Sequence, residues 1–476
     1  MGYSTKLRES PRGSTTRSSA QAHGLSGPLH QGGLSKNMLV DSKMERKDAS
    51  PALSKRVCVI GLGFAGLPTA AAIASAGHKT TGLDIDAAKV ASINGGHATS
   101  GISAAAIAPL IEDGSLTATT DAAAIARAEV VVISVPTPID SEGRPYEVPV
   151  ERACETVLEH VSDGTLIVMQ CTVVPGTTRR LLVDPLNAAG RKVGEDIFVA
   201  FSPERINPGD PVFNVSNTTK LVAGATDACL DRGREFVASF VSTAMPVASL
   251  ETGELAKLVE NTFRFINISF VNEMAVLCDR FGVNPWNVIQ AAASKPFAFM
   301  AHFPGPGIGG DCIPVSPRYL QAAAERKGLV SDVIAASFRA TGRMPGHVAD
   351  RLAALLAERG RVMTGARVIV VGLAYKPDIA DARHSPAIGV IHELESRGAQ
   401  VLVHDPLATG IIVDGVLRPS VPLDRVWPAG AVGADAAVVI TPHSSIDYVA
   451  LAGQVGVVLD TRNALSAVES DRIVSL

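Results

Sequence analysis

The sequence contains little cysteine, and its cysteines are scattered. Six occur in 476 residues, with no CxxC pair and no histidine cluster at ligand spacing: Cys58, Cys154, Cys171, Cys229, Cys278 and Cys312. This spacing fits neither a disulfide framework nor a zinc site. We therefore expect free thiols and no bound metal.

The chain also lacks long apolar runs and concentrations of charge of one sign. No stretch reaches the roughly 18 apolar residues that a membrane helix needs, and the N-terminus has no hydrophobic signal core. The net charge of −4 is spread along the chain, without a basic stripe. These absences predict a cytoplasmic protein that binds neither membranes nor nucleic acids.

Residues 1–50 are rich in serine, glycine, arginine and proline and have almost no periodic apolar positions. Such a segment cannot offset the entropy of ordering, so we expect a disordered tail. A serine- and arginine-rich start with few acids is also found in organellar transit peptides. We favour a plain extension, or a start codon placed upstream of Met38 or Met44. The rest of the chain is too long for one core and predicts two or three domains.

A dinucleotide motif follows the tail. Residues 57–60 are typical of a buried strand, and Gly61, Gly63 and Gly66 form a G-x-G-x-x-G loop that opens a helix of small residues. A second strand ends at Asp84, 23 positions after Gly61. The glycines let a pyrophosphate lie against backbone N–H groups, and the acid reaches the adenosine ribose. Because an acid repels a ribose phosphate, the motif predicts NAD rather than NADP.

Three further apolar segments end in polar loops. They lead to Thr137, to Thr172, and to Glu204 with Asn207. In a doubly wound sheet, ligands bind beyond the carboxyl ends of the strands, so we expect these residues at the nicotinamide end of the cofactor. Each loop alone would pass for a surface turn, but three together favour a shared site.

A long helix is predicted over residues 250–283. Its apolar periodicity rests on Leu255, Leu258, Val259, Phe263 and Ile266. Lys257 and Asn261 are four residues apart and therefore share one face. The ordinary explanation is a solvated face or a stabilising hydrogen bond. The functional alternative is a cation and an amide directed at an oxyanion beside Cys312.

Cys312 lies in a loop of unusual composition, residues 303–320, which read FPGPGIGGDCIPVSPRYL. Four glycines before the cysteine leave room for close approach of a substrate to a nucleophile. Cys58 and Cys278, by contrast, lie in apolar runs and are expected to be buried hydrophobic residues.

Taken together, these motifs resemble the UDP-glucose/GDP-mannose dehydrogenase family, and within it the UDP-N-acetyl-hexosamine 6-dehydrogenase branch. The matching segments are VCVIGLGFAGLPTA, VPTPI, FSPERINPGD, ETGELAKLVENTFRFINISFVNEMA, AAASKPFAFMAHFPGPGIGGDCIP, VIVVGLAYKPDIADARHSPA, VHDP and DTRNA. They run from residue 57 to about residue 464, so the resemblance covers nearly everything except the tail.

The resemblance implies an α/β fold with two Rossmann-like doubly wound domains joined by a central helical dimerisation segment. The expected domains are a tail (1–50), an NAD-binding domain (51–248), a central helical domain with the cysteine loop (249–362) and a UDP-sugar-binding domain (363–476). A second strand-turn-helix unit near residue 367 supports this order independently, and it lacks the G-x-G-x-x-G loop. The expected assembly is a homodimer or a higher homo-oligomer.

The resemblance also implies a chemistry, the twofold oxidation of a sugar's primary alcohol to a carboxylate with two NAD⁺ through a thioester on the cysteine. The implied catalytic residues are Cys312, Lys257, Asn261, Glu204 and Thr172. The implied cofactor-binding residues are Gly61, Gly63, Phe64, Ala65, Gly66, Asp84, Lys89, Thr137 and Thr172. The implied substrate-binding residues are Glu204, Arg205, Asn207, Lys257, Asn261, Phe303, Gly309, Lys376, Arg383 and Arg462.

The chain departs from the family pattern at several positions near these residues. Ser316 stands where the family has an aspartate four residues after the cysteine, and Asp311 stands where this branch commonly has histidine. Gln170 and Cys171 replace a common Glu-Ser pair, and His384 replaces a glutamate. A serine hydroxyl cannot hold a negative charge near neutral pH, and an acid beside Cys312 opposes thiolate formation.

Three functions therefore remain open. The first is the NAD-dependent UDP-sugar 6-dehydrogenase, acting on UDP-N-acetylglucosamine or UDP-N-acetylmannosamine, with UDP-glucose or GDP-mannose as alternative substrates. The second is a β-hydroxyacid type of dehydrogenase, against which the cysteine loop and the second α/β unit argue. The third is a degenerate protein that binds NAD and UDP-sugar without turnover. The sequence does not select the sugar.

Overall fold

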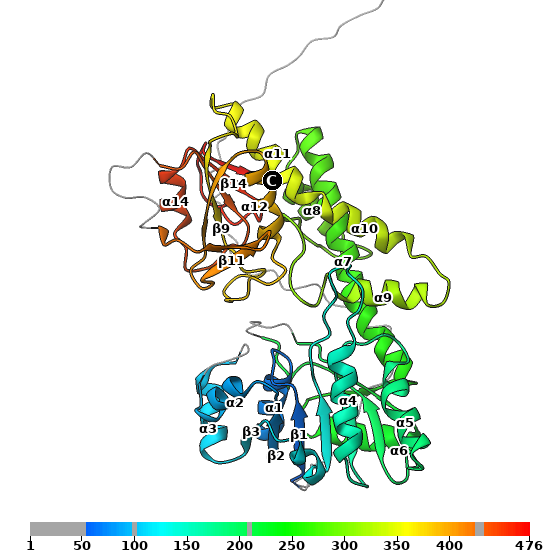
Figure 1. Ribbon diagram of the computed structural model, residues 1–476. Coiled ribbons are helices and arrows are strands. Elements are labelled where there is room, and N and C mark those ends of the chain that lie inside the picture. Colours follow the sequence, from blue (N-terminus) through cyan, green and yellow to red (C-terminus); the bar gives the residue numbers. More distant parts are fainter. Residues whose placement is uncertain (1–53, 98–101, 207–211, 424–432) are drawn as a thin grey trace, which may run out of the picture. The chain divides into compact units, whose positions relative to one another are not determined.

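A computed structural model describes residues 54–97, 102–206, 212–423 and 433–476 (Figure 1). The predicted tail 1–50 and the predicted substrate ligand Asn207 lie outside the described residues. The described residues belong to one compact unit, Ala49–Leu476.

The first sheet has eight strands in the order β3-β2-β1-β4-β5-β6-β7-β8. Its strands are β1 (Arg56–Ile60), β2 (Lys79–Leu83), β3 (Leu116–Thr119), β4 (Val130–Ile133), β5 (Leu166–Met169), β6 (Phe198–Phe201), β7 (Lys220–Gly224) and β8 (Ala244–Pro246). All neighbours pair in parallel except β6 and β7. The strand order reverses between β1 and β4, which is where a doubly wound sheet binds its ligand.

Both faces of this sheet are covered, because alternate side chains of each strand point to opposite sides. Val57 and Val59 of β1 pack with α1 (Gly66–Ser75), α2 (Ala87–Asn94), α3 (Ala104–Glu112) and α6 (Asp227–Ala238). Cys58 and Ile60 face the other core, which includes the 3-10 helix Ala122–Arg127, α4 (Val148–His160), the π-helical turn Arg179–Val183 and α5 (Asp184–Ala188). The burial predicted for Cys58 is thus confirmed.

The second sheet has five parallel strands in the order β10-β9-β13-β14-β15. They are β9 (Arg367–Val371), β10 (Gln400–His404), β13 (Ala436–Val439), β14 (Val457–Asp460) and β15 (Ile473–Ser475), and a separate hairpin joins β11 (Gly410–Val413) to β12 (Val416–Pro419). Helices α11 (Met344–Ala357) and α12 (Pro386–Ser396) pack on one face, and α14 (Tyr448–Gln454) packs on the other. The predicted fold, two doubly wound sheets with a helical segment between them in the chain, is confirmed.

The helical segment begins with α7 (Leu250–Phe281), followed by α8 (Pro285–Ala293), α9 (Ser316–Glu325) and α10 (Asp332–Gly342). The hydroxyl oxygen of Ser249 accepts a hydrogen bond from Thr252 N and caps the start of α7. Of the residues that predicted this helix, Leu258 is buried, whereas Leu255, Val259 and Phe263 are 41%, 49% and 47% exposed. The apolar pattern therefore marks two faces of α7, of which one is uncovered.

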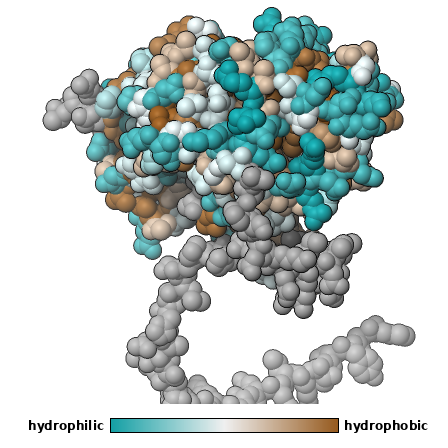
Figure 2. Space-filling view, turned by 90° about the horizontal axis from the view of Figure 1, so that it is seen from below, coloured by the Kyte–Doolittle hydropathy of each residue, from teal (hydrophilic) through white to brown (hydrophobic). Residues whose placement is uncertain are grey.

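The face shown in Figure 2 carries hydrophilic and hydrophobic residues intermixed, without one kind gathered over the whole of it. Among the residues that the structure describes, no helix is both long and apolar enough to cross a membrane.

Candidate active site

The glycine loop after β1 has the form that a dinucleotide requires. Gly61 has a φ of +88°, and a Cβ there would meet Ser134 O at 2.5 Å, so only glycine fits the turn. A Cβ on Gly66 would strike the carbonyl oxygen of Gly61. At Gly63 a Cβ would meet nothing within 4 Å, which leaves open space at the start of α1. A pyrophosphate fits that space, since the helix N-terminus favours negative charge. Phe64 and Ala65 complete the loop.

Asp84 follows β2 directly and is almost fully buried. Its Oδ2 accepts hydrogen bonds from Leu62 N (2.8 Å) and Lys89 Nζ (2.9 Å), and its Oδ1 accepts one from Asp86 N (3.0 Å). Burial works against ionisation, but these donors outweigh it and place the pKa of Asp84 below its usual value. The predicted ribose acceptor is therefore a carboxylate, and the predicted residue Lys89 is its ion-pair partner.

Three predicted residues lie just beyond adjacent strands of the first sheet. Thr137 follows β4, Thr172 follows β5 and Glu204 follows β6, and the parallel pairing of these strands places all three at the same edge. The buried side chain of Tyr319 on α9 donates a hydrogen bond to Pro138 O (2.9 Å). This contact fixes the helix after the cysteine loop against the loop of Thr137.

Glu204 is held by a residue that the sequence did not suggest. Its Oε2 accepts hydrogen bonds from Lys220 Nζ (2.8 Å) and Thr69 Oγ1 (3.1 Å), and its Oε1 accepts from the N–H groups of Arg205 and Ile206. Burial disfavours the charge, but Lys220 and the other donors outweigh it and lower the pKa of Glu204. A lysine at the start of a strand carries no motif, so pattern analysis gives no indication of Lys220.

Cys312 is the exposed cysteine among the six, and the other five are buried, which confirms the burial predicted for Cys278. The protein around the sulfur displaces water and raises the pKa of the thiol, Lys257 lowers it, and Asp311 raises it further. The net pKa lies above the ordinary value of 9.0. Lys257 thus lowers the pKa of the thiol but does not outweigh the effect of burial.

Lys257 has a lowered pKa because burial disfavours its charge, which Cys312, Glu260 and Glu204 partly restore. The lysine therefore lies within electrostatic reach of both the thiol and Glu204. The catalytic role of Lys257 stays a prediction.

Asn261 reaches the cysteine loop through Ser316. Its Nδ2 donates a hydrogen bond to Ser316 Oγ (2.8 Å), and that hydroxyl donates to Cys312 O (2.9 Å). Both Asn261 and Ser316 are buried. The serine that departs from the family pattern therefore positions the backbone of the cysteine, although it adds no charge.

The cysteine loop packs closely on the loop that follows β9. A Cβ on Gly309 would meet His384 O and Tyr375 Cβ at 2.8 Å, and a Cβ on Gly310, with φ +89°, would meet the Tyr375 ring at 2.9 Å. The predicted residue Gly309 is thus required by space. Tyr375 was not recognised from the sequence.

Arg383 forms ion pairs with two aspartates near Cys312. It forms ion pairs with Asp381 (2.7 Å) and Asp311 (3.1 Å), and its guanidinium lies 5.2 Å from the centre of the Phe64 ring. His384 Nε2 lies 3.4 Å from Asp311 Oδ1. Two departures from the family pattern, Asp311 and His384, are therefore in contact with each other.

The remaining predicted substrate residues are less closely grouped. Arg205 pairs with Glu260 at 2.6 Å, and Phe303 is 47% exposed. Arg462 donates from Nε to Ile440 O (2.9 Å), lies against Gly305, and has its pKa lowered to about 10 by burial. Lys376 lies next to Tyr375 and is partly buried.

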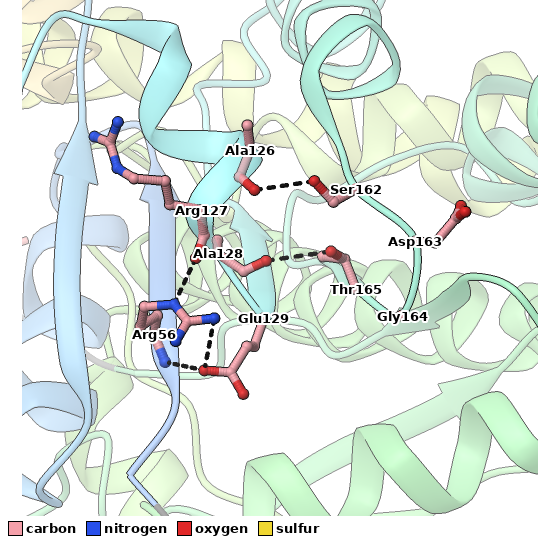
Figure 3. Close-up of a pocket in the computed structure, with 9 residues that line it drawn as sticks. All are labelled: Arg56, Ala126, Arg127, Ala128, Glu129, Ser162, Asp163, Gly164 and Thr165. Carbon is pink, nitrogen blue, oxygen red and sulfur yellow. Dashed lines mark hydrogen bonds and ion pairs between the residues drawn. The ribbon is translucent and has the colours of Figure 1, made fainter.

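A hollow of about 470 Å³ lies at the opposite, amino-terminal edge of the first sheet, and no predicted site residue lines it (Figure 3). Its polar groups are paired with one another: Arg56 Nε donates to Arg127 O (2.7 Å), Ser162 Oγ to Ala126 O, and Thr165 Oγ1 to Ala128 O. It does not contribute to the site. No group of three or more potential metal ligands occurs within the described ranges.

Comparisons with known proteins agree with this geometry. The chain matches three models of the UDP-glucose/GDP-mannose dehydrogenase family: the NAD binding domain (residues 55–241), the central domain (251–340) and the UDP binding domain (369–467). The chain therefore belongs to the UDP-glucose/GDP-mannose dehydrogenase family. The predictions of the family and of NAD as cofactor are confirmed, and the chain is an NAD-dependent UDP-sugar dehydrogenase by membership.

Individual relatives are moderately similar over most of the chain. Protein CapL of Staphylococcus aureus is 31% identical over 88% of this chain and 98% of its own length. The UDP-N-acetyl-D-glucosamine 6-dehydrogenase of Pseudomonas aeruginosa is 33% identical over 74% of this chain and 82% of its own. A solved structure, the UDP-D-ManNAc dehydrogenase from Pyrococcus horikoshii, superposes with a TM-score of 0.79 at 30% identity, covering 88% and 98% of the two chains.

Asp84 should determine the cofactor preference. We expect Asp84→Ala to weaken NAD binding about tenfold, because the ribose loses its acceptor. NADP binding should improve relative to NAD, because Lys89 loses its partner and faces the phosphate. Fluorescence titration with both cofactors measures this, with Asp86→Asn as the control in the same turn. An unchanged ratio of the two dissociation constants would contradict this role of Asp84.

The thiol of Cys312 should titrate above pH 9, the ordinary value that its surroundings raise. Since the thiolate is the form that reacts, the rate at which iodoacetamide alkylates the free enzyme should still be rising with pH at pH 9. Lys257→Ala removes a nearby cation and should move the curve to higher pH, whereas exposed Lys327→Ala should not. Rapid alkylation at pH 7 that is insensitive to Lys257→Ala would show that the two groups are not coupled.

Proposed function

We propose that the protein oxidises the C6 alcohol of a UDP-N-acetyl-hexosamine to the uronic acid, through a covalent intermediate on Cys312. The observation that carries this proposal is the electrostatic interaction of one half-buried lysine, Lys257, with both the exposed residue Cys312 and the carboxylate of Glu204. The overall reaction is alcohol + 2 NAD⁺ + H₂O → carboxylate + 2 NADH + 3 H⁺.

The glycine loop would hold NAD⁺, which when bound would supply the hydride acceptor for each oxidation. After the first oxidation the sulfur of Cys312 attacks the aldehyde and forms a thiohemiacetal, and the second oxidation converts it to a thioester. The thiol proton must leave at the attack, and Lys257, whose pKa burial lowers, is placed to receive it. Water then hydrolyses the thioester and frees the thiol.

Lys257 and Asn261 also stabilise the oxyanions that form on the substrate carbon. The Asn261 amide donates one N–H to Ser316 Oγ, so its second N–H group remains for the substrate. Glu204 and Thr172, at the ends of β6 and β5, hold the attacking water. The lowered pKa of Glu204 keeps it a hydrogen-bond acceptor at neutral pH.

Substrate binding is assigned to residues from both sheets and from the loop between them. Arg383 faces the cysteine loop from the second sheet, where Arg462 lies against Gly305. Phe303 and Gly309 provide apolar surface and space within the loop. Arg205, Asn207 and Lys376 complete the set on the strength of the family resemblance alone.

The N-acetyl-hexosamine is chosen because relatives named for such substrates match over most of the chain. Either UDP-N-acetylglucosamine or UDP-N-acetylmannosamine satisfies the proposal. The domain limits at residues 50, 248 and 362, and the cytoplasmic location, stay predictions from the sequence.

We further propose that the protein is a homodimer through the uncovered face of α7. Leu255, Val259, Phe263 and Phe270 are all exposed and recur at helical spacing along this face. This apolar strip is about 22 Å long. When two copies pack about a twofold axis, the strip of each copy covers the same strip of the other.

Counting NADH tests the reaction. With UDP-N-acetylglucosamine or UDP-N-acetylmannosamine we expect two NADH per sugar consumed. One NADH per sugar would favour a simple alcohol dehydrogenase, and none with any of the UDP- and GDP-sugars would favour a binding protein without turnover.

Cys312→Ser should release almost no uronic acid, because a serine alkoxide is far harder to form at neutral pH than a thiolate. Binding of NAD and UDP-sugar should persist, since one atom changes. Cys278→Ser, at a buried cysteine outside the site, is the control. Near-normal uronate formation by Cys312→Ser would refute the thioester route.

Light scattering tests the dimer. We expect a mass of about twice 49.4 kDa for the native chain and a folded monomer for the Val259→Glu, Phe263→Glu double variant. Val449→Glu, an exposed apolar position on α14, should leave the dimer intact. A dimer that survives the double variant would place the interface elsewhere.

A further inference from the structure

A buried polar network lies beneath the carboxyl edge of the first sheet. Lys220, at the start of β7, is only 2% exposed, although lysine is among the residues least often buried. Its ammonium donates to Glu204 Oε2 (2.8 Å), Pro203 O (3.3 Å) and Gln170 Oε1 (3.4 Å). All three N–H groups therefore have partners.

The network continues through Gln170 to the cofactor helix. Gln170 Nε2 donates to Thr69 Oγ1 (3.0 Å) on α1 and to Ser134 Oγ (3.1 Å) after β4. The orientation of the amide is determined, because a lysine can only donate and so requires the amide oxygen. Among the described residues, the carboxylate that pairs with Lys220 is Glu204, and Gln170 is neutral.

We propose that Lys220 is a positioning residue for the reaction, holding Glu204 ionised and fixed in orientation at the end of β6. This inference rests on the proposed function, in which Glu204 holds the attacking water. The geometry supports it in two ways: Lys220 faces the carboxylate from beneath at ion-pair distance, and Oε1 is fixed by two backbone N–H groups. Thr69 Oγ1 occupies the fourth acceptor position of the carboxylate (3.1 Å), but it also lies 2.9 Å from Ala65 O. Its single hydrogen can turn to that carbonyl and leave the fourth position to water.

Two cations act on Glu204. Lys220 contacts it from β7, and Lys257 on α7 lies within electrostatic reach. Lys257 is placed to change its protonation during turnover, whereas Lys220 is sealed in a saturated network. Lys220 therefore supplies the constant charge, and Glu204 stays anionic whether Lys257 is charged or neutral.

The direct test follows the ionisation of Glu204 without turnover. In protein labelled with ¹³C at the glutamate carboxyl carbon, the Glu204 signal is assigned by its loss in Glu204→Gln. It should titrate below the ordinary value of 4.5 in the wild type and in Lys220→Arg. In Lys220→Met it should titrate higher by about one pH unit or more. Lys192→Met, at an exposed lysine, is the matched control.

Because Lys220→Met leaves a buried carboxylate without a partner and endangers folding, Gln170→Glu provides a second variant. It places another carboxylate on Lys220 and should also raise the Glu204 titration. The rate of uronate formation is also measured against pH. Its acid limb should move to higher pH in Lys220→Met and in Gln170→Glu, and it should return to the wild-type position in Lys220→Arg. The KM for NAD should stay nearly unchanged in all three variants.

The outcomes separate the two proposals. A Glu204 signal that titrates identically in the wild type, Lys220→Met and Gln170→Glu overturns the role of Lys220, whatever the enzyme turns over. Absence of NADH formation by the wild type, with the Glu204 shift present, overturns the proposed function and leaves the role of Lys220 in fixing this charge supported.

Discussion

The close packing of the cysteine loop on Tyr375 is the constraint on which the site depends. Gly309 and Gly310 have no room for a side chain, so the backbone before Cys312 lies directly on the loop that follows β9. On its other side, Ser316 binds Asn261 of α7. The thiol is thereby held among groups from the helical segment and from the second sheet, with Lys257 near enough to influence it.

The two sheets use an acid at the end of their second strand in different ways. Asp84 after β2 accepts hydrogen bonds from two backbone N–H groups and from Lys89 Nζ, three donors in all. Asp405 after β10 accepts four backbone N–H groups, among them Leu373 N (2.7 Å), and His443 Nε2 (2.9 Å), while Asp378 N donates to His443 Nδ1. A carboxylate so fully bonded has no acceptor left for a ribose, which accords with a dinucleotide site in the first sheet alone.

Much of this arrangement was predictable from the sequence, because local chemistry determines it. The glycine loop, Asp84, the strand-end loops and α7 all follow from periodicity and spacing. Lys220, Gln170 and Tyr375 were not predicted as partners, because their contacts join segments up to about a hundred residues apart and depend on the register of the sheet. The apolar stripe of α7 was found, but periodicity cannot tell a buried face from one left uncovered.

The central claim is that the sugar becomes covalently attached to Cys312 after the first oxidation and stays attached until water hydrolyses the thioester. Acid quenching of turnover in Glu204→Gln, where attack of water is slowed, followed by peptide mass spectrometry, tests it directly. The account predicts a sugar ester on the peptide of Cys312 that hydroxylamine removes, formed with two NADH per site. Uronate production with Cys312 unmodified at every quench time, in this variant and in the wild type, would contradict it.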